Sequence, residues 1–186
     1  MKTAIILSLV LFAGVFFAFS SAKNRTGRII LPGGVTYLGP TPTSITWATY
    51  TGKVFPYSFS HPSSLSLGFF PNDPTDGVTL FLDNTDPGAN LFFRVEVCKG
   101  SPCEAKTYAN DWWKEYNWKS VKQITEFTNS NGLKGFRATY IAQDNTTPYD
   151  HVFFEVPDSP DKIIWISGKL FTKEIFDKLV DSVEWK

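Results

Sequence analysis

The only two cysteines of the chain, Cys98 and Cys103, are separated by Lys99-Gly100-Ser101-Pro102. This is not the CxxC spacing of thioredoxin-type proteins, so a catalytic redox pair is not predicted. A Gly-Ser-Pro turn can bring the two thiols together, and in an oxidising compartment we expect a structural disulfide. Because the closed loop is short, the bond would contribute at most about 2 kcal/mol. In a reducing cytoplasm the same residues would remain free thiols.

Imidazole chemistry can come only from His61 and His151, which we expect to be hydrogen-bonded surface residues. No HxH, HxxxH or Cys/His spacing accompanies them, so we predict no metal site and no cofactor. The strings GxSxG and HExxH are also absent. One catalytic alternative remains, an envelope-glycan hydrolase or metal-dependent enzyme that uses Asp150, His151 and Glu155. Four aspartates lack the alternation of a calcium loop and are interpreted as turn residues: Asp73, Asp76, Asp83 and Asp86.

Aromatic residues provide the main indication of a binding function. Five of them lie within eleven residues, more than one helical stripe can bury: Tyr108, Trp112, Trp113, Tyr116 and Trp118. An exposed Trp113 or Trp118 could stack on a sugar ring, which would make the chain a glycan-binding module. The alternative is that Trp118 packs at the helix end against the following strand, because most large aromatic side chains are buried. The predicted binding residues are Trp113, Trp118, Asp150 and His151.

The charge balance bears on the class of partner. The 186 residues include 18 basic and 18 acidic ones, so the formal net charge is zero. Nucleic-acid binding requires excess positive surface, so no nucleic-acid partner is expected. Apolar residues make up 42% of the chain and aromatic residues 16%, which is typical of a folded domain with a sheet-rich core.

The first 22 residues are set apart from the fold as a targeting segment. Lys2 precedes an uncharged run over residues 3–22, which predicts either a cleaved secretory signal or a retained membrane anchor. Small residues at Ser20-Ser21-Ala22 suit signal peptidase. Basic residues just after the run argue against export: Lys23, Arg25 and Arg28. We nevertheless predict an extracytoplasmic protein, secreted or anchored through residues 3–22, whose partner is a protein or a cell-envelope component.

The remaining sequence divides into a linker and a domain. Residues 23–53 are rich in Gly, Pro and Thr and predict a linker, part of which could form an edge strand. Alternating apolar residues then predict strands at 54–60, 67–70, 78–82 and 91–97. An amphipathic helix is expected to extend to residue 116. It begins either at an early capping box, with Ser101 as the cap, Pro102 at the first helical position and Glu104 reaching back, or near Thr107. A second helix over residues 172–183 is expected to be capped by Thr172.

Residues 121–168 predict a four-strand antiparallel meander. Asn131-Gly132 favours a two-residue hairpin turn, which would place Phe127 opposite Phe136. The later strands are apolar on both faces and require cover on both sides. We therefore predict an α+β domain at 54–186, with one mostly antiparallel sheet of about seven or eight strands covered by amphipathic helices. It is expected to act as a non-catalytic binding or scaffold domain.

The element order and several short patterns resemble the PsbP-like family. These patterns are Tyr57-Ser58-Phe59-Ser60-His61-Pro62, the 91–97 strand leading into the 108–116 helix, Gly135-Phe136 in the hairpin and the closing 176–183 helix. The resemblance covers residues 54–186 and implies an α/β/α sandwich in an exported or lumenal protein. The family includes an extrinsic subunit of the oxygen-evolving photosystem and uncharacterised exported proteins. The N-terminus departs from the Ser- and Arg-rich transit peptide of a plant member, which argues against a photosystem role.

Overall fold

The computed structural model describes residues 29–30, 36–37, 45–81, 90–98, 103–168 and 172–186. The main sheet contains β5 (Ser66–Phe69), β6 (Val78–Phe81), β7 (Asn90–Val97), β8 (Ser120–Thr128), β9 (Lys134–Ile141), β10 (Asp150–Glu155) and β11 (Lys162–Gly168). A smaller sheet contains β3 (Trp47–Thr51), β4 (Tyr57–Pro62) and β12 (Glu184–Trp185). Two short strands, β1 (Ile29–Ile30) and β2 (Thr36–Tyr37), pair with each other. The helical elements are α1 (Ala105–Trp112), the 3₁₀ turn η2 (Trp113–Glu115) and α2 (Lys173–Asp181).

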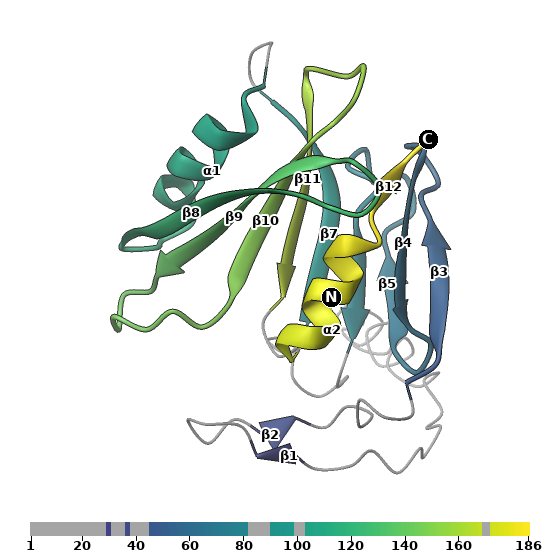
Figure 1. Ribbon diagram of the computed structural model, residues 1–186, viewed down its shortest axis with the longest axis horizontal. Coiled ribbons are helices and arrows are strands. Elements are labelled where there is room, and N and C mark those ends of the chain that lie inside the picture. Colours follow the sequence, from purple (N-terminus) through teal and green to yellow (C-terminus); the bar gives the residue numbers. More distant parts are fainter. Residues whose placement is uncertain (1–28, 31–35, 38–44, 82–89, 99–102, 169–171) are drawn as a thin grey trace, which may run out of the picture.

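The strand order of the main sheet is β5-β6-β7-β11-β10-β9-β8, and every pairing in it is antiparallel. The smaller sheet, of order β12-β4-β3, packs against one of its faces (Figure 1). The predicted α+β class and the four-strand meander are confirmed. The predicted opening strand is β4, which belongs to the smaller sheet. Its Tyr57 and Phe59 rings stack on the main sheet, and each ring centroid lies 4.6 Å from that of Phe93.

Both faces of the main sheet are covered. Phe153 and Phe154, which are consecutive in β10, are fully buried on opposite faces. Helix α1 covers one face over β8 to β10, and its buried residues are Ala105, Ala109 and Trp112. Helix α2 and the smaller sheet cover the other face. Side chains alternate between faces along a strand, so the doubly apolar strands of the sequence correspond to a sheet between two layers.

Helix α2 forms as predicted. The Thr172 hydroxyl accepts a hydrogen bond from the Ile175 N–H at 3.4 Å, and the buried residues are Ile175, Phe176, Leu179 and Val180. Helix α1 begins after Glu104 without a side-chain cap and passes into η2 after Trp112. Ser101, which was considered as its cap, lies outside the described residues.

The hairpin between β8 and β9 differs from the predicted register by one residue. Phe127 pairs with Gly135 and not with Phe136. The loop has three residues, because the Asn129 N–H donates to the Leu133 carbonyl and Gly132 adopts φ +80°. A turn followed by a left-handed glycine is the common three-residue hairpin loop. This one-residue slip exchanges the two faces of β9 relative to those of β8.

Two of the aspartates interpreted as turn residues stabilise loops. The Asp73 carboxylate accepts hydrogen bonds from the N–H groups of Thr75 and Gly77. The buried Asp76 carboxylate accepts the N–H groups of Val54 and Phe55, at 2.8 and 3.0 Å. Asp83 and Asp86 lie outside the described residues.

None of the helices in the described ranges is long and apolar enough to span a membrane. Residues 1–22, which were predicted as a signal or anchor, lie outside those ranges. Part of the predicted linker forms β3, the edge strand of the smaller sheet.

Candidate functional site

The two cysteines form the expected disulfide. Cys98 and Cys103 are bonded, with Cα atoms 5.8 Å apart. The bond joins the residue after β7 to the approach to α1. The Cys98 N–H donates to the Asp161 carbonyl at 2.9 Å, and both cysteines pack against the core beneath α1. The disulfide therefore has a structural position.

The structure does not bring Asp150, His151 and Glu155 together. Asp150 and His151 are consecutive in β10, so their side chains leave opposite faces of the sheet. Glu155 shares the face of His151 but lies four residues further along, roughly 13 Å at the rise of an extended strand. The three residues considered for the catalytic alternative thus do not converge on one reacting atom.

His151 is a core residue and not the surface residue that was expected. It is 1% exposed, and its Nδ1 accepts a hydrogen bond from the Trp165 indole N–H at 3.2 Å. The nearest rings are those of Trp112 and Tyr140, with centroids 4.5 and 5.0 Å away. Burial lowers the pKa of His151 from 6.5 to about 3, so the ring is neutral at physiological pH. His61 is also buried rather than on the surface.

The two tryptophans predicted to bind are partly used by the core. Trp118 is half-buried, and its ring contacts Tyr140 and Tyr149 at centroid distances of 5.9 and 5.5 Å. The ring is therefore partly buried, as the alternative expected, but its contacts are with Tyr140 of β9 and with Tyr149 before β10. Trp113 is also half-buried and packs on the same α1-side core.

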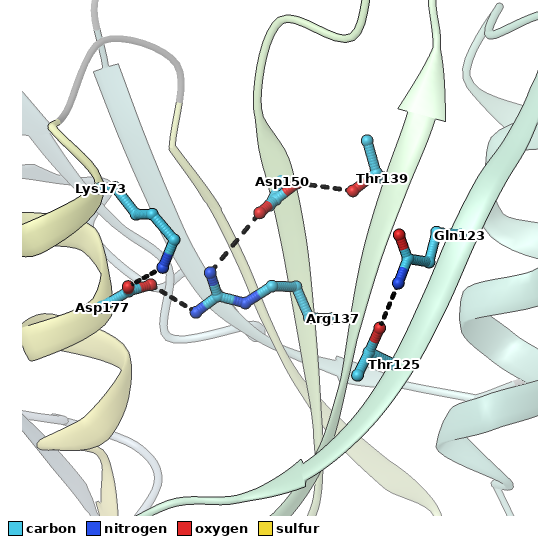
Figure 2. Close-up of polar contacts among 7 residues, drawn as sticks. All are labelled: Gln123, Thr125, Arg137, Thr139, Asp150, Lys173 and Asp177. Atoms are coloured by element: carbon cyan, nitrogen blue, oxygen red, sulfur yellow. Dashed lines mark hydrogen bonds and ion pairs between the residues drawn. The ribbon is translucent and has the colours of Figure 1, made fainter.

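A polar cluster lies on the other face of the sheet, between α2 and the strands β8 to β10 (Figure 2). Its centre is Arg137 of β9, which donates to Asp177 Oδ1 of α2 at 2.6 Å. The other terminal nitrogen of Arg137 lies 3.5 Å from Asp150 Oδ2. Thr139 donates its hydroxyl hydrogen to Asp150 Oδ1 at 2.8 Å, and Lys173 donates to Asp177 Oδ2. These five residues are called the Arg137 cluster.

The hairpin register assembles this cluster. In the observed pairing Arg137 lies opposite Thr125, and Thr139 lies between Gln123 and Asp150 of the neighbouring strands. A polar strip therefore crosses β8, β9 and β10 on one face. On α2, Lys173 and Asp177 are four residues apart and so share a side of the helix. Figure 2 shows these side chains facing each other across the space between helix and sheet.

The cluster holds its charges in partly buried, defined positions. The side chains of Arg137, Asp150 and Asp177 are 23%, 33% and 35% exposed. Burial raises the pKa of Asp177, but hydrogen bonds from Lys173 and Arg137 outweigh it, and the net pKa is lowered. Asp177 is therefore ionised at neutral pH. Two cations and two carboxylates nearly balance, which suits hydrogen-bonded recognition better than attraction of a highly charged ligand.

An open groove of about 440 Å³ adjoins the Arg137 cluster. Its lining combines apolar and charged side chains: Phe127, Arg137, Asp177, Lys178, Val180 and Asp181. Within the described ranges, no group of three or more His, Cys, Asp or Glu residues could hold a metal ion. The groove thus combines an apolar wall, from Phe127 and Val180, with an arginine held in place by carboxylates.

Of the predicted site residues, only Asp150 belongs to the cluster. The sequence contained a signal for Arg137 and Thr139, which alternate with the apolar Phe136 and Ala138 along β9. That alternation indicates one apolar and one polar face of the strand. Asp177 is distant in the sequence and lies beside Arg137 only because α2 docks on the sheet.

Comparison with known proteins bears on the fold. No family model matches the sequence, and no curated protein matches it. The solution structure of cyanobacterial PsbP (CyanoP) from Synechocystis sp. PCC 6803 is similar, with a TM-score of 0.57 over 77% of this chain and 94% of that chain. This chain has a PsbP-like fold. The expected resemblance is thus confirmed for the architecture of the PsbP-like domain, and at 13% identity it concerns the fold alone.

A crystal structure of a protein from Bacteroides thetaiotaomicron covers 88% of this chain and 49% of that chain, with 12% identity and a TM-score of 0.30. This similarity is too low to support a statement about this chain.

Proposed function

We propose that this PsbP-like domain is a non-catalytic, extracytoplasmic binding or scaffold domain. It binds a protein or a cell-envelope component through the Arg137 cluster and the adjoining groove. The protein is secreted or is tethered through residues 3–22. The observation that carries the proposal is Arg137, which is held between carboxylates from α2 and β10 at the groove.

The geometry of Arg137 supports recognition at this surface. Arginine is enriched at the energetic centres of protein interfaces because its planar fork forms several directed hydrogen bonds. Here Asp177 and Asp150 orient the fork before any partner arrives, which reduces the entropy lost on binding. The partly exposed guanidinium can therefore donate hydrogen bonds to a carbonyl or carboxylate of the partner with little rearrangement.

The disulfide supports the proposed compartment. Disulfides persist in oxidising environments and are rare in reducing ones. The uncharged run at residues 3–22 provides a route for export. The residues considered for catalysis are divided between the two faces of the main sheet, with Asp150 on one face and His151 and Glu155 on the other. This division supports a non-catalytic domain.

Replacing Arg137 with Gln should weaken partner binding at least about tenfold, since about 1.4 kcal/mol corresponds to a tenfold change in Kd. The probe is the envelope fraction of the source cells, immobilised and titrated with purified domain. The matched control is Arg94→Gln, because Arg94 lies in β7 and its ion pair with Glu96, at 2.7 Å, is on the opposite face. Equal binding by wild type and Arg137→Gln would refute the site.

In source cells the protein should fractionate outside the cytoplasm, with both cysteines unreactive toward thiol reagents until they are reduced. Denaturation without reductant should expose no thiol, because Cys98 and Cys103 are bonded. Two reactive thiols in a cytoplasmic fraction would contradict the proposed location. The binding site would then still be tested separately by the Arg137→Gln variant.

A further inference from the structure

Strand β8 ends the main sheet. In the part of the chain that the structure describes, β8 pairs with β9 alone. The strand is nine residues long, and five of its side chains are exposed: Lys122, Gln123, Thr125, Glu126 and Thr128. An exposed edge of this length is a template for pairing with another strand, because its outward backbone groups have no sheet partner.

The hairpin loop identifies the residues whose backbone groups point outward. The Asn129 N–H donates to the Leu133 carbonyl at 3.1 Å, so these two residues form a hydrogen-bonded pair. Hydrogen-bonded and non-hydrogen-bonded pairs alternate along antiparallel strands. The N–H and C=O groups of Ile124, Glu126 and Thr128 therefore point away from β9.

We propose that β8 is a dimerisation edge. Two copies of this chain pair their β8 strands antiparallel about a twofold axis at Ile124, which joins the two main sheets into one. The occupant of the edge is thus a second copy of the chain. The charges along the strand select this partner and its register.

Among the registers that place outward groups opposite one another, those centred in the middle of the strand have their axis at Ile124, Thr125 or Glu126. An axis at Glu126 places two glutamates in direct opposition, which is destabilising. An axis at Thr125 places Ile124 opposite Glu126. An axis at Ile124 places Lys122 of each copy opposite Glu126 of the other and places the two Ile124 side chains together. Only this last register combines two ion pairs with an apolar contact.

The structure also limits the length of the interface. The register between β8 and β9 shifts between Val121 and Gln123, so Lys122 lies at a β-bulge. A bulge bends an edge strand and ends regular pairing. The paired stretch is therefore centred on residues 122–126, and such a short interface predicts a weak dimer whose population depends on concentration.

The dimer would present two binding surfaces in one direction. A twofold axis perpendicular to the sheet keeps each face of the sheet continuous across the interface. Both Arg137 clusters would then face the same side, and a repetitive partner could engage both grooves at once. The dimer does not depend on the proposed function, and each can fail without the other.

Sedimentation velocity of the purified protein across a wide concentration range tests the dimer. Glu126→Lys and Lys122→Glu should each weaken dimerisation at least about tenfold, because each creates two like-charge contacts. The combined variant restores opposite charges and should dimerise as the wild type does. Lys134→Gln is the matched control, since Lys134 is on β9 and pairs with Glu126 within the chain at 3.6 Å. A wild type that stays monomeric at every concentration would overturn the proposal.

Disulfide crosslinking tests the register. Paired residues at the axis have Cα atoms about 5.5 Å apart, within the reach of a disulfide. Ile124→Cys should therefore form a covalent dimer under mild oxidation, because the two native cysteines are already bonded to each other. Thr125→Cys should not, since diagonal neighbours lie roughly 7 to 8 Å apart. Equal crosslinking of both variants would overturn the register.

Discussion

Acidification from pH 6.5 to pH 3 should lower the free energy of unfolding by up to about 5 kcal/mol through His151 alone. The folded protein keeps the imidazole neutral because burial lowers its pKa to about 3. The unfolded chain binds the proton near pH 6.5. Since the unfolded state binds more protons between these values, stability falls as the pH decreases. The contribution is fully present above pH 6.5 and is lost by pH 3.

The variant His151→Gln separates this effect from the titration of carboxylates. In the native protein, His151 accepts a hydrogen bond from the Trp165 indole N–H at 3.2 Å. A glutamine side chain can also accept this hydrogen bond, but glutamine does not titrate. Urea unfolding measured at several pH values should show a smaller loss of stability with acid in the variant. Parallel pH dependences for the two proteins would show that His151 is not the responsible group.

Replacing Asn129 with Ala should lower the free energy of unfolding by about 3 kcal/mol, because the substitution leaves buried polar groups without partners. The buried Asn129 Oδ1 accepts the N–H groups of Asn131 and Leu133, at 3.1 and 2.9 Å. Its Nδ2 donates to the Val183 carbonyl after α2 at 2.7 Å. One side chain therefore closes the hairpin loop and binds it to the end of the helix. Chemical denaturation measures the loss.

Asn131→Ala is the matched control. Asn131 is in the same loop and its Nδ2 donates to the same Val183 carbonyl at 3.1 Å, but its side chain is exposed. The Val183 carbonyl keeps its hydrogen bond from Asn129 in this variant, so we expect a loss below about 1 kcal/mol. If the Asn131 variant were as destabilised as the Asn129 variant, the buried network around Asn129 would not be the cause.

The hairpin network also bears on the proposed binding site. The loop that Asn129 closes sets the register of β9 against β8, and that register brings Arg137 to the α2 side of the sheet. Gly135 lies on the same face, where a Cβ atom would approach the Phe154 ring to 2.7 Å. The Phe127 ring, which packs on the buried Phe154 at this glycine, forms part of the apolar wall beside the cluster. The site therefore depends on the same contacts that stabilise the hairpin.

Several elements followed from local patterns alone. The periodicity of residues 172–183 and the Thr172 cap predicted α2, because both signals depend on neighbours within one or two turns. Alternation predicted β7 and the meander for the same reason. The short Gly-Ser-Pro spacing predicted the disulfide. Each of these features is decided by residues close together in the sequence.

The register of the hairpin was not predictable from Asn131-Gly132. That dipeptide suits a two-residue turn, but Asn129 accepts and donates hydrogen bonds across the loop and binds Val183, more than fifty residues away. Tertiary contacts thus selected the three-residue loop over the locally favoured turn. The same reasoning explains the opening strand, whose aromatic rings stack on β7 instead of extending the main sheet.

The sequence by itself determined the α+β class, the disulfide, both amphipathic helices and the PsbP-like order of elements, since these depend on composition and short periods. Only the tertiary structure decided where chemistry is placed. It divided Asp150 from His151, buried both histidines, and brought Arg137 of β9 within 2.6 Å of Asp177 of α2. The physical reason is that a binding site is formed by side chains distant in sequence, whose proximity depends on strand register and helix docking.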